Sequence, residues 1–221
     1  GEGVCHLTGE SRTYFDDMGR EIQSQAKDVM TNKVWASETL YDKFGRRAIT
    51  TLVAPTGYSN IRYKDNFVLD AQGNPYGHND FEDGMLNNPN PVGKQSNTLG
   101  WWYSSNNDEE EWQATTDYPY TRLDYSKITY AVRRTSSPGN THRMGSGHEV
   151  KSYTMPAGSE LSYFFRDQHP LCLLAGNSDY DANNAIQSIC NTLSYTPRYL
   201  KTISEDADGK QSVAFTDGYG N

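Results

Sequence analysis

The sequence predicts a mainly β fold, an antiparallel sheet built from β-hairpins with one or two short helices and a long central loop. A hairpin-like motif recurs, and the chain is rich in aromatic residues, with 16 Tyr and 4 Trp among 221 residues. Such residues, mixed with Thr, Ser, Gly and Asn, suit half-buried pleated sheet better than helical bundles. Only 35% of the residues are hydrophobic and the mean hydropathy is -0.82. We therefore expect a lean core.

The recurring motif is Asp-x-x-Gly-Arg between two strand-like segments. Its first copy is Asp16-Asp17-Met18-Gly19-Arg20, and 26 positions later it returns as Asp42-Lys43-Phe44-Gly45-Arg46. An Asp side chain can accept hydrogen bonds from backbone N–H groups two residues on, and Gly accepts positive φ at the end of a tight turn. Each copy is therefore expected to form a β-hairpin.

Degenerate copies of the turn follow further along the chain. They are Asp70-Ala71-Gln72-Gly73-Asn74, Asp206-Ala207-Asp208-Gly209-Lys210 and Asp217-Gly218-Tyr219-Gly220-Asn221. The last copy has no returning strand after it, so we expect the chain to be a fragment of a longer protein. The predicted structural turn residues are Asp16, Gly19, Arg20, Asp42, Gly45, Arg46, Asp70, Gly73, Asp206, Gly209, Asp217 and Gly220.

We interpret residues 1–221 as a single β-rich segment with three regions. Residues 1–73 carry hairpin repeats, residues 74–148 are loop-rich and aromatic, and residues 149–221 combine strands and short helices with repeat-like turns. Asn-Pro pairs mark the central loop, because the residue before Pro avoids the α region. Further strands are expected over 118–125 and 128–134, and helices are expected only over 157–165 and 181–193.

Charge and cysteine content exclude some classes of protein and leave one question open. The net charge is -8 with scattered Lys and Arg, whereas nucleic-acid binding needs a basic stripe. No run approaches the ~20 apolar residues of a membrane span, so none is expected in this chain. The cysteines are Cys5, Cys172 and Cys190. A Cys172–Cys190 disulfide in an exported protein and ordinary buried thiols both remain open.

The repeated motif resembles that of the Rhs/YD-repeat family, whose unit runs Tyr-x-x-x-Gly-Arg with an Asp before the Gly. More specifically, the chain is similar to the N-terminal or early-repeat regions of long Rhs-type proteins of the Bacteroides group. Later stretches carry this closer resemblance, namely Trp102-Tyr103-Ser104, Tyr118–Tyr125, Ser137–Asn140, Gly145–His148 and Thr202–Lys210. Beyond the second copy the Arg becomes Asn or Lys, which favours an irregular entry or capping segment.

The resemblance implies a scaffold role. Rhs-like chains wind long sheets into a hollow shell, which encloses an effector in toxins and stands at the cell surface in other members. The implied function is a non-catalytic segment of such a secreted or cell-surface shell. The implied partners are other parts of the full-length chain, with toxin cargo or surface glycan as further candidates. The implied location is extracellular or on the cell surface.

We expect no catalytic residues, no cofactor and no metal ligands. The sequence has no nucleophile elbow, phosphate loop or dinucleotide fingerprint. The motif carboxylates are better explained as turn caps than as metal ligands or an acid–base pair. His142 and His148 lack the spacing of a zinc site, and we expect His148 to bond a loop carbonyl instead.

One aromatic cluster supports an alternative function. Trp101, Trp102, Tyr103 and Trp112 surround a polar, acidic tip over residues 104–111. Exposed rings could stack on sugars in a carbohydrate-binding module, whereas buried rings would pack between sheet and loop. Burial is the preferred interpretation. A secreted hydrolase is a weaker third hypothesis, because no catalytic set can be named for it.

Overall fold

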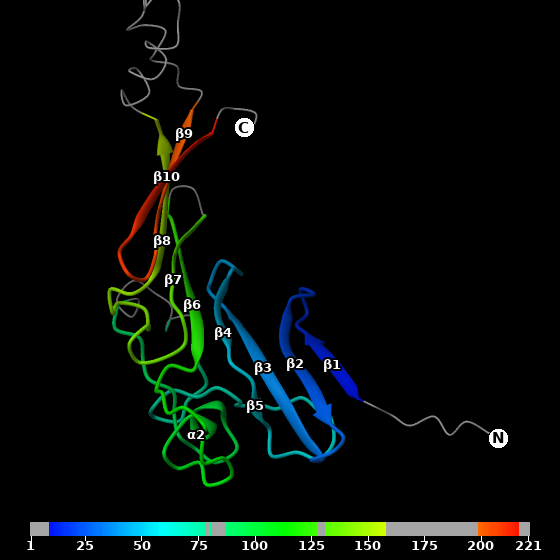
Figure 1. Ribbon diagram of the computed structural model, residues 1–221. Helices are drawn as coiled ribbons and strands as arrows, with labels where there is room; N and C mark the ends of the chain where they lie inside the picture. Colours follow the sequence, from blue (N-terminus) through cyan, green and yellow to red (C-terminus); the bar gives the residue numbers. More distant parts are fainter. Residues whose placement is uncertain (1–8, 78–79, 81–86, 128–130, 158–198, 217–221) are drawn as a thin grey trace, which may run out of the picture. The chain divides into compact units, whose positions relative to one another are not determined.

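The computed structural model describes residues 9–77, 80, 87–127, 131–157 and 199–216, and it confirms a mainly β, antiparallel fold (Figure 1). The described residues form ten strands and one short α-helix. The elements are β1 (Glu10–Phe15), β2 (Glu21–Asp28), β3 (Lys33–Tyr41), β4 (Arg47–Thr51), β5 (Ala54–Pro55), α2 (Leu99–Trp102), β6 (Tyr120–Tyr125), β7 (Val132–Thr135), β8 (Val150–Pro156), β9 (Leu200–Glu205) and β10 (Gln211–Thr216).

Several sequence predictions lie outside the described residues. Both predicted helices do so from residue 158 onward, and so do Cys172, Cys190 and the turn from Asp217 to Gly220. Cys5 lies outside them at the start of the chain. The chain divides into two compact units, residues 1–150 with 206–209, and residues 151–205 with 210–221.

Hairpins build the sheet of the first unit. Its strands are ordered β1-β2-β3-β4-β6-β7, each antiparallel to its neighbours, and β5 pairs with β3. Gln23 of β2 lies opposite Glu38 of β3, and Ile49 of β4 lies opposite Arg122 of β6. Residues 52–119 therefore connect two neighbouring strands.

Strand β9 is the central strand of the second unit, with β8 and β10 on either side. Tyr153 and Val213 both lie opposite Ile203, so the three side chains share one face. The Lys151 Nζ lies 2.6 Å from a carboxylate oxygen of Glu205 across the β8–β9 ladder. Most side chains of β10 are exposed.

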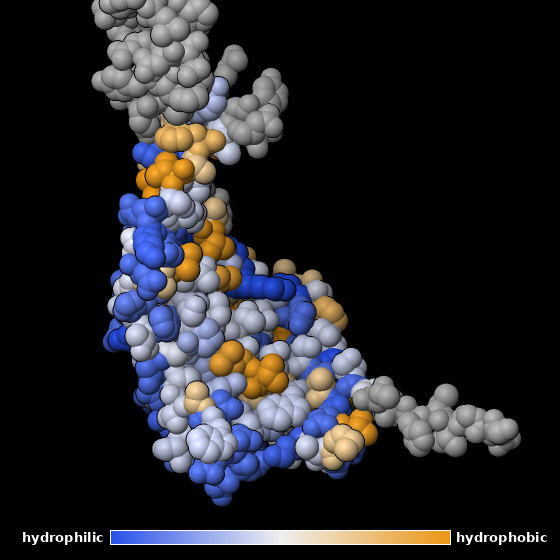
Figure 2. All heavy atoms as spheres, in the orientation of Figure 1, coloured by the Kyte–Doolittle hydropathy of each residue, from blue (hydrophilic) through white to orange (hydrophobic). Residues whose placement is uncertain are grey.

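The hydrophobic core of the first unit lies between the sheet and its long connection. Strand residues Ala36, Ile49 and Tyr120 pack with connection residues that include Phe67 and Trp102. The face shown in Figure 2 carries mostly hydrophilic residues, with hydrophobic ones in small separate groups. The small hydrophobic core expected from the composition therefore lies where the connection covers the strands.

Helix α2 corrects the prediction that helices occur only over 157–165 and 181–193. Thr98 is its N-cap, and the Thr98 side chain accepts a hydrogen bond from the backbone N–H of Trp101 at 3.3 Å. Leu99 and Trp102 are buried in the core. A four-residue helix has no apolar periodicity, and tertiary packing holds it instead.

Two buried glutamines lie on the covered face of β2, where apolar residues would be expected. The Gln23 side chain donates to the Lys64 carbonyl at 3.0 Å and accepts from the Lys64 backbone N–H at 2.9 Å. The Gln25 side chain donates to the Arg62 carbonyl at 2.8 Å. An irregular segment laid on a sheet has backbone groups without ladder partners, and a buried unpaired group costs free energy. These amides supply the missing partners.

A buried carboxyl lies next to these glutamines. Glu38 is opposite Gln23 in the sheet and is almost fully buried. Burial raises the pKa of Glu38 to about 8, the nearby Asp65 charge adds to the rise, and a hydrogen bond from the Val68 backbone opposes it. The Glu38 carboxyl is therefore mostly protonated in the folded chain at neutral pH.

This raised pKa predicts that the first unit loses stability as pH rises. The folded chain binds the Glu38 proton more tightly than the unfolded chain, whose pKa is near 4.5, so the contribution is complete below that value and is lost as pH rises toward 8. The full effect is on the order of a few kcal/mol. Urea unfolding between pH 4.5 and 8 should show a decline in wild type that is absent in Glu38→Gln. The exposed Glu10→Gln is the control, and equal pH slopes in wild type and Glu38→Gln would contradict the prediction.

Candidate functional site

The first repeat turn joins β1 to β2 through a network centred on Asp16. Asp16 Oδ1 accepts hydrogen bonds from the backbone N–H groups of Met18 and Arg20, both at 2.9 Å. Asp16 Oδ2 accepts from Arg20 Nε at 2.7 Å, and Arg20 Nη2 lies 2.6 Å from the same oxygen. Gly19 has φ 73°, and its N–H donates to the Asp16 carbonyl at 2.9 Å. One carboxylate thus holds both the turn and the arginine.

The second turn, between β3 and β4, repeats this network. Asp42 Oδ1 accepts from the backbone N–H groups of Phe44 and Arg46 at 2.9 Å, and Asp42 Oδ2 accepts from Arg46 Nε at 2.8 Å. Gly45 has φ 75°. The two turns are built in the same way.

Two degenerate turns keep backbone contacts of the network. Asp70 Oδ1 accepts from the N–H groups of Gln72 and Asn74, and Gly73 has φ 89°. Asp206 Oδ1 accepts from Asp208 N–H at 3.0 Å, and Gly209 has φ 80°. The positions of the two arginines are taken by Asn74 and Lys210.

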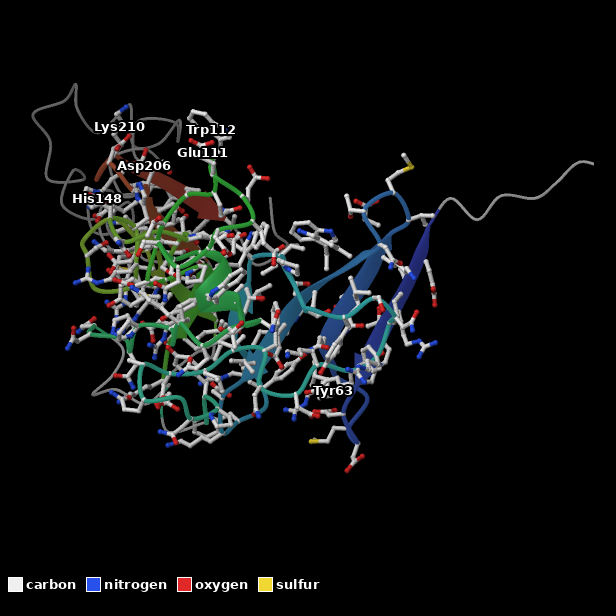
Figure 3. All side chains as sticks on the ribbon, turned by 90° about the horizontal axis from the view of Figure 1, so that it is seen from below. Tyr63, Glu111, Trp112, His148, Asp206 and Lys210 are labelled. Carbon is white, nitrogen blue, oxygen red and sulfur yellow. The ribbon has the colours of Figure 1, made fainter. Side chains whose placement is uncertain are left out.

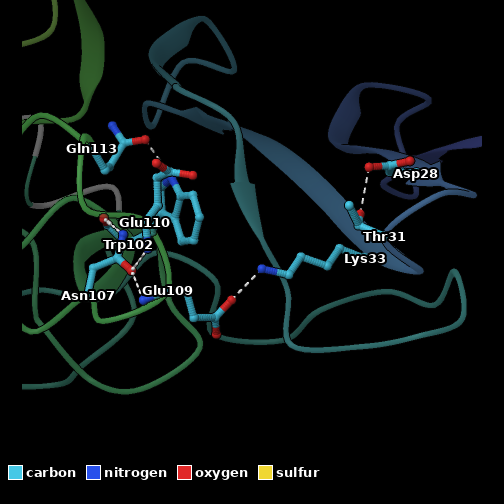
Figure 4. Close-up of polar contacts among 8 residues, drawn as sticks. All are labelled: Asp28, Thr31, Lys33, Trp102, Asn107, Glu109, Glu110 and Gln113. Carbon is cyan, nitrogen blue, oxygen red and sulfur yellow. Dashed lines mark hydrogen bonds and ion pairs between the residues drawn. The ribbon is translucent and has the colours of Figure 1, made fainter.

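A further Asp-centred turn was not anticipated from the sequence. Between β2 and β3, Asp28 accepts a hydrogen bond from Thr31 Oγ1 (Figure 4). It also accepts one from Met30 N–H, and Asn32 has φ 55°. Asn replaces Gly at the left-handed position, which Asn tolerates better than most residues. A search for Asp followed by Gly therefore misses it.

Each turn arginine also contacts the neighbouring hairpin. The Arg20 guanidinium carbon lies 4.4 Å from the centre of the Tyr41 ring, and Tyr41 Oη donates to the Glu21 carbonyl at 2.8 Å. Likewise the Arg46 guanidinium carbon lies 4.3 Å from the centre of the Tyr125 ring, and Tyr125 Oη donates to the Arg47 carbonyl at 2.8 Å. We call this paired contact the Arg–Tyr clasp. The two clasps join β2 to β3 and β4 to β6.

The clasp gives Gly45 a second constraint that Gly19 lacks. A Cβ at Gly45 would lie 2.8 Å from Arg20 Nη1, whereas a Cβ at Gly19 would meet nothing within 4 Å. Both glycines have positive φ. Only Gly45 also leaves room for the arginine of the preceding turn.

The turn network changes the acidity of Asp16. The Arg20 backbone hydrogen bond and then the Arg20 side chain lower the pKa of this carboxyl, while desolvation opposes them. The Asp16 carboxyl is therefore charged at neutral pH. Its contribution to stability is complete above the unfolded value near 3.8 and is lost as the solution is acidified below it.

The predicted aromatic cluster separates into buried and exposed members. Trp102 is 4% exposed and Tyr103 is buried, and the Trp102 Nε1–H donates to Gln113 Oε1 at 3.0 Å (Figure 4). Trp101 is partly buried and packs against the core. Trp112 is 86% exposed and, with Glu111, extends into solvent (Figure 3). Core packing therefore accounts for Trp102 and Tyr103, but not for Trp112.

Trp101 also lines a pocket of about 300 Å³. Tyr58, Lys33 and Glu109 are also among its lining residues. The Lys33 Nζ lies 2.5 Å from a Glu109 carboxylate oxygen (Figure 4). Arg62 covers the Tyr58 ring at 3.7 Å from its centre. The pocket lining thus combines aromatic rings with hydrogen-bonding groups.

His142 and His148 lie close together. The rings of His142 and His148 are 5.6 Å apart, and His148 Nδ1 lies 3.0 Å from the Ala207 carbonyl. The buried Glu149 accepts a hydrogen bond from Gly145 N–H. Among the described residues, no three His, Cys, Asp or Glu side chains are grouped to hold a metal ion.

Comparisons with known proteins returned no relatives. No family model, no curated protein and no solved structure matches the chain. In the part of the chain that the structure describes, no helix is long and apolar enough to cross a membrane.

The difference between the two glycines leads to a prediction about stability. Gly19→Ala should cost about 1–2 kcal/mol, because a non-glycine residue enters the left-handed region. Gly45→Ala should cost more, by roughly 0.5–1 kcal/mol, because its Cβ displaces Arg20 from Tyr41. Urea unfolding measures both changes. In an Arg20→Met background the excess cost should disappear, and an excess that persists there would exclude the clasp as its cause.

Proposed function

We propose that this chain is a non-catalytic structural segment of a large secreted or cell-surface protein of the Rhs/YD-repeat type, contributing to a β-sheet shell or scaffold. The single observation that carries the proposal is the Arg–Tyr clasp, formed twice between consecutive hairpins. The first clasp uses Arg20 and Tyr41, and the second uses Arg46 and Tyr125.

The clasp is suited to adding hairpins one after another. It joins the returning strand of one hairpin to the outgoing strand of the next, so it does not depend on how many hairpins precede it. Because residues 52–119 lie between β4 and β6, the second clasp also spans a long insertion. A wall built from this unit can therefore accept insertions without losing sheet continuity.

The charged groups of the repeat are engaged in structure. In both Asp16 and Asp42, one carboxylate oxygen accepts hydrogen bonds from two backbone N–H groups and the other accepts from an arginine side chain. Both oxygens of each carboxylate are therefore occupied. Such carboxylates serve as turn caps and not as acids or bases. The proposed partners are other parts of the full-length chain, with toxin cargo or surface glycan as secondary candidates.

The proposal predicts the size and location of the intact protein. In the cells that produce the protein, an antibody raised against this chain should detect a polypeptide with a mass far above 24.9 kDa. Protease added to intact cells should remove the signal, or the culture medium should contain it. A cytosolic marker protein serves as the control for lysis. A single band near 24.9 kDa inside the cell would contradict two claims, that the chain is part of a larger protein and that this protein belongs to a secreted or cell-surface shell.

The Trp101 pocket favours a second candidate, a carbohydrate-binding module. Sugars stack on aromatic rings, and the Lys33–Glu109 pair offers charged hydrogen-bonding groups in the lining. In this case a glycan array should give saturable binding that Trp101→Ala removes and Trp112→Ala retains. The scaffold proposal expects no binding on the array. Binding that only Trp112→Ala removes would place the sugar outside the pocket.

A further inference from the structure

Strand β1 lies at one end of the sheet order in the first unit. It pairs with β2 on one side, and among the described residues no strand pairs with its outer edge. Most of its side chains are exposed. The backbone N–H and C=O groups of an edge strand can pair with a further strand.

Phe15 occupies, in β1, the position that the clasp tyrosines occupy in later hairpins. Phe15 directly precedes Asp16, as Tyr41 precedes Asp42. The backbone hydrogen bond that closes each of these turns is also equivalent, from Asp16 to Arg20 and from Asp42 to Arg46, both at 2.9 Å. Tyr125 precedes Ser126, whose backbone N–H donates to the Ala131 carbonyl, five positions on, at 2.9 Å.

The environment of Phe15 differs from that of its two counterparts. Tyr41 and Tyr125 are partly buried beneath an arginine, whereas Phe15 is 59% exposed. An aromatic ring attracts a guanidinium over its face whether or not the ring carries a hydroxyl group. Phe15 therefore offers the stacking half of a clasp without the hydrogen-bonding half.

We infer that the outer edge of β1 is a docking site for the returning strand of another Asp-x-x-Gly-Arg hairpin, whose arginine stacks on Phe15. The added strand would run antiparallel to β1. Continuing the β2–β3 and β4–β6 registers toward the turns places Arg20 opposite Tyr41 and Arg46 opposite Tyr125, so the incoming arginine would lie opposite Phe15. The inference rests on the proposed function, because it names the partner of the sheet edge.

The chain's own second hairpin supplies the probe. A cyclised peptide of residues 39–51 contains the turn and Arg46, and cyclisation is needed because an isolated two-stranded hairpin is only marginally stable. The peptide is titrated into the full isotope-labelled chain while the β1 amide signals are followed by NMR. Saturable shifts of the β1 amides are expected.

Variants at Phe15 should change the affinity in opposite directions. Phe15→Tyr restores the hydroxyl that Tyr41 and Tyr125 use, so the peptide should bind about fivefold more tightly, the effect of one net hydrogen bond. Phe15→Ser, or Arg46→Met in the peptide, should weaken binding roughly threefold or more through loss of the ring–cation contact. Thermal melting of each chain variant checks that it is folded.

Met18→Ser is the matched control, because Met18 is 77% exposed on the same hairpin but lies outside the clasp position. It should leave the affinity unchanged. The inference is overturned by an absence of β1 shifts up to about 1 mM peptide, the limit of weak binding. It is also overturned if Phe15→Tyr and Phe15→Ser bind the peptide as wild type does. Neither result bears on the size or location of the intact protein. The proposed function is tested by those two properties, so its failure can be distinguished from failure of this inference.

Discussion

The structure of the first unit depends on a repeated interaction in which a single carboxylate binds both a turn and an arginine. Asp16 and Asp42 fix the backbone N–H groups of their turns with one oxygen and orient an arginine with the other. A free arginine side chain would lose considerable rotamer entropy on stacking, roughly 2 kcal/mol for full immobilisation. Because the carboxylate has already oriented the guanidinium, the clasp with the next hairpin forms at a smaller entropic cost.

A sheet held at its turns can tolerate an unusually polar covered face. Gln23 and Gln25 hydrogen-bond to the backbone of Arg62 and Lys64, and Glu38 is buried beside them with a raised pKa. Apolar residues there would leave the N–H and C=O groups of the connection unpaired. The low hydrophobic content of the chain thus reflects a core in which side-chain amides form hydrogen bonds that a neighbouring strand would otherwise supply.

Local features of this fold could be predicted from the sequence, and contacts between distant residues could not. The β class is confirmed, and Asp-x-x-Gly lies at turns because the capping contacts span only four residues. Tyr125 gave no such signal, since it precedes Ser126 and lies 78 positions from its partner Arg47. Nor could composition separate the buried Trp102 from the exposed Trp112, because burial depends on how residues 52–119 fold over the sheet.

The most direct test of this account is a pair of double-mutant cycles across the two clasps. Arg20→Met with Tyr41→Leu, and Arg46→Met with Tyr125→Leu, are compared with their single variants by urea unfolding. The account predicts a coupling free energy of roughly 0.5–2 kcal/mol in both cycles, since each pair is in contact and partly desolvated. Coupling indistinguishable from zero in both would show that the turns act independently, and would contradict the clasp as the element that joins the hairpins.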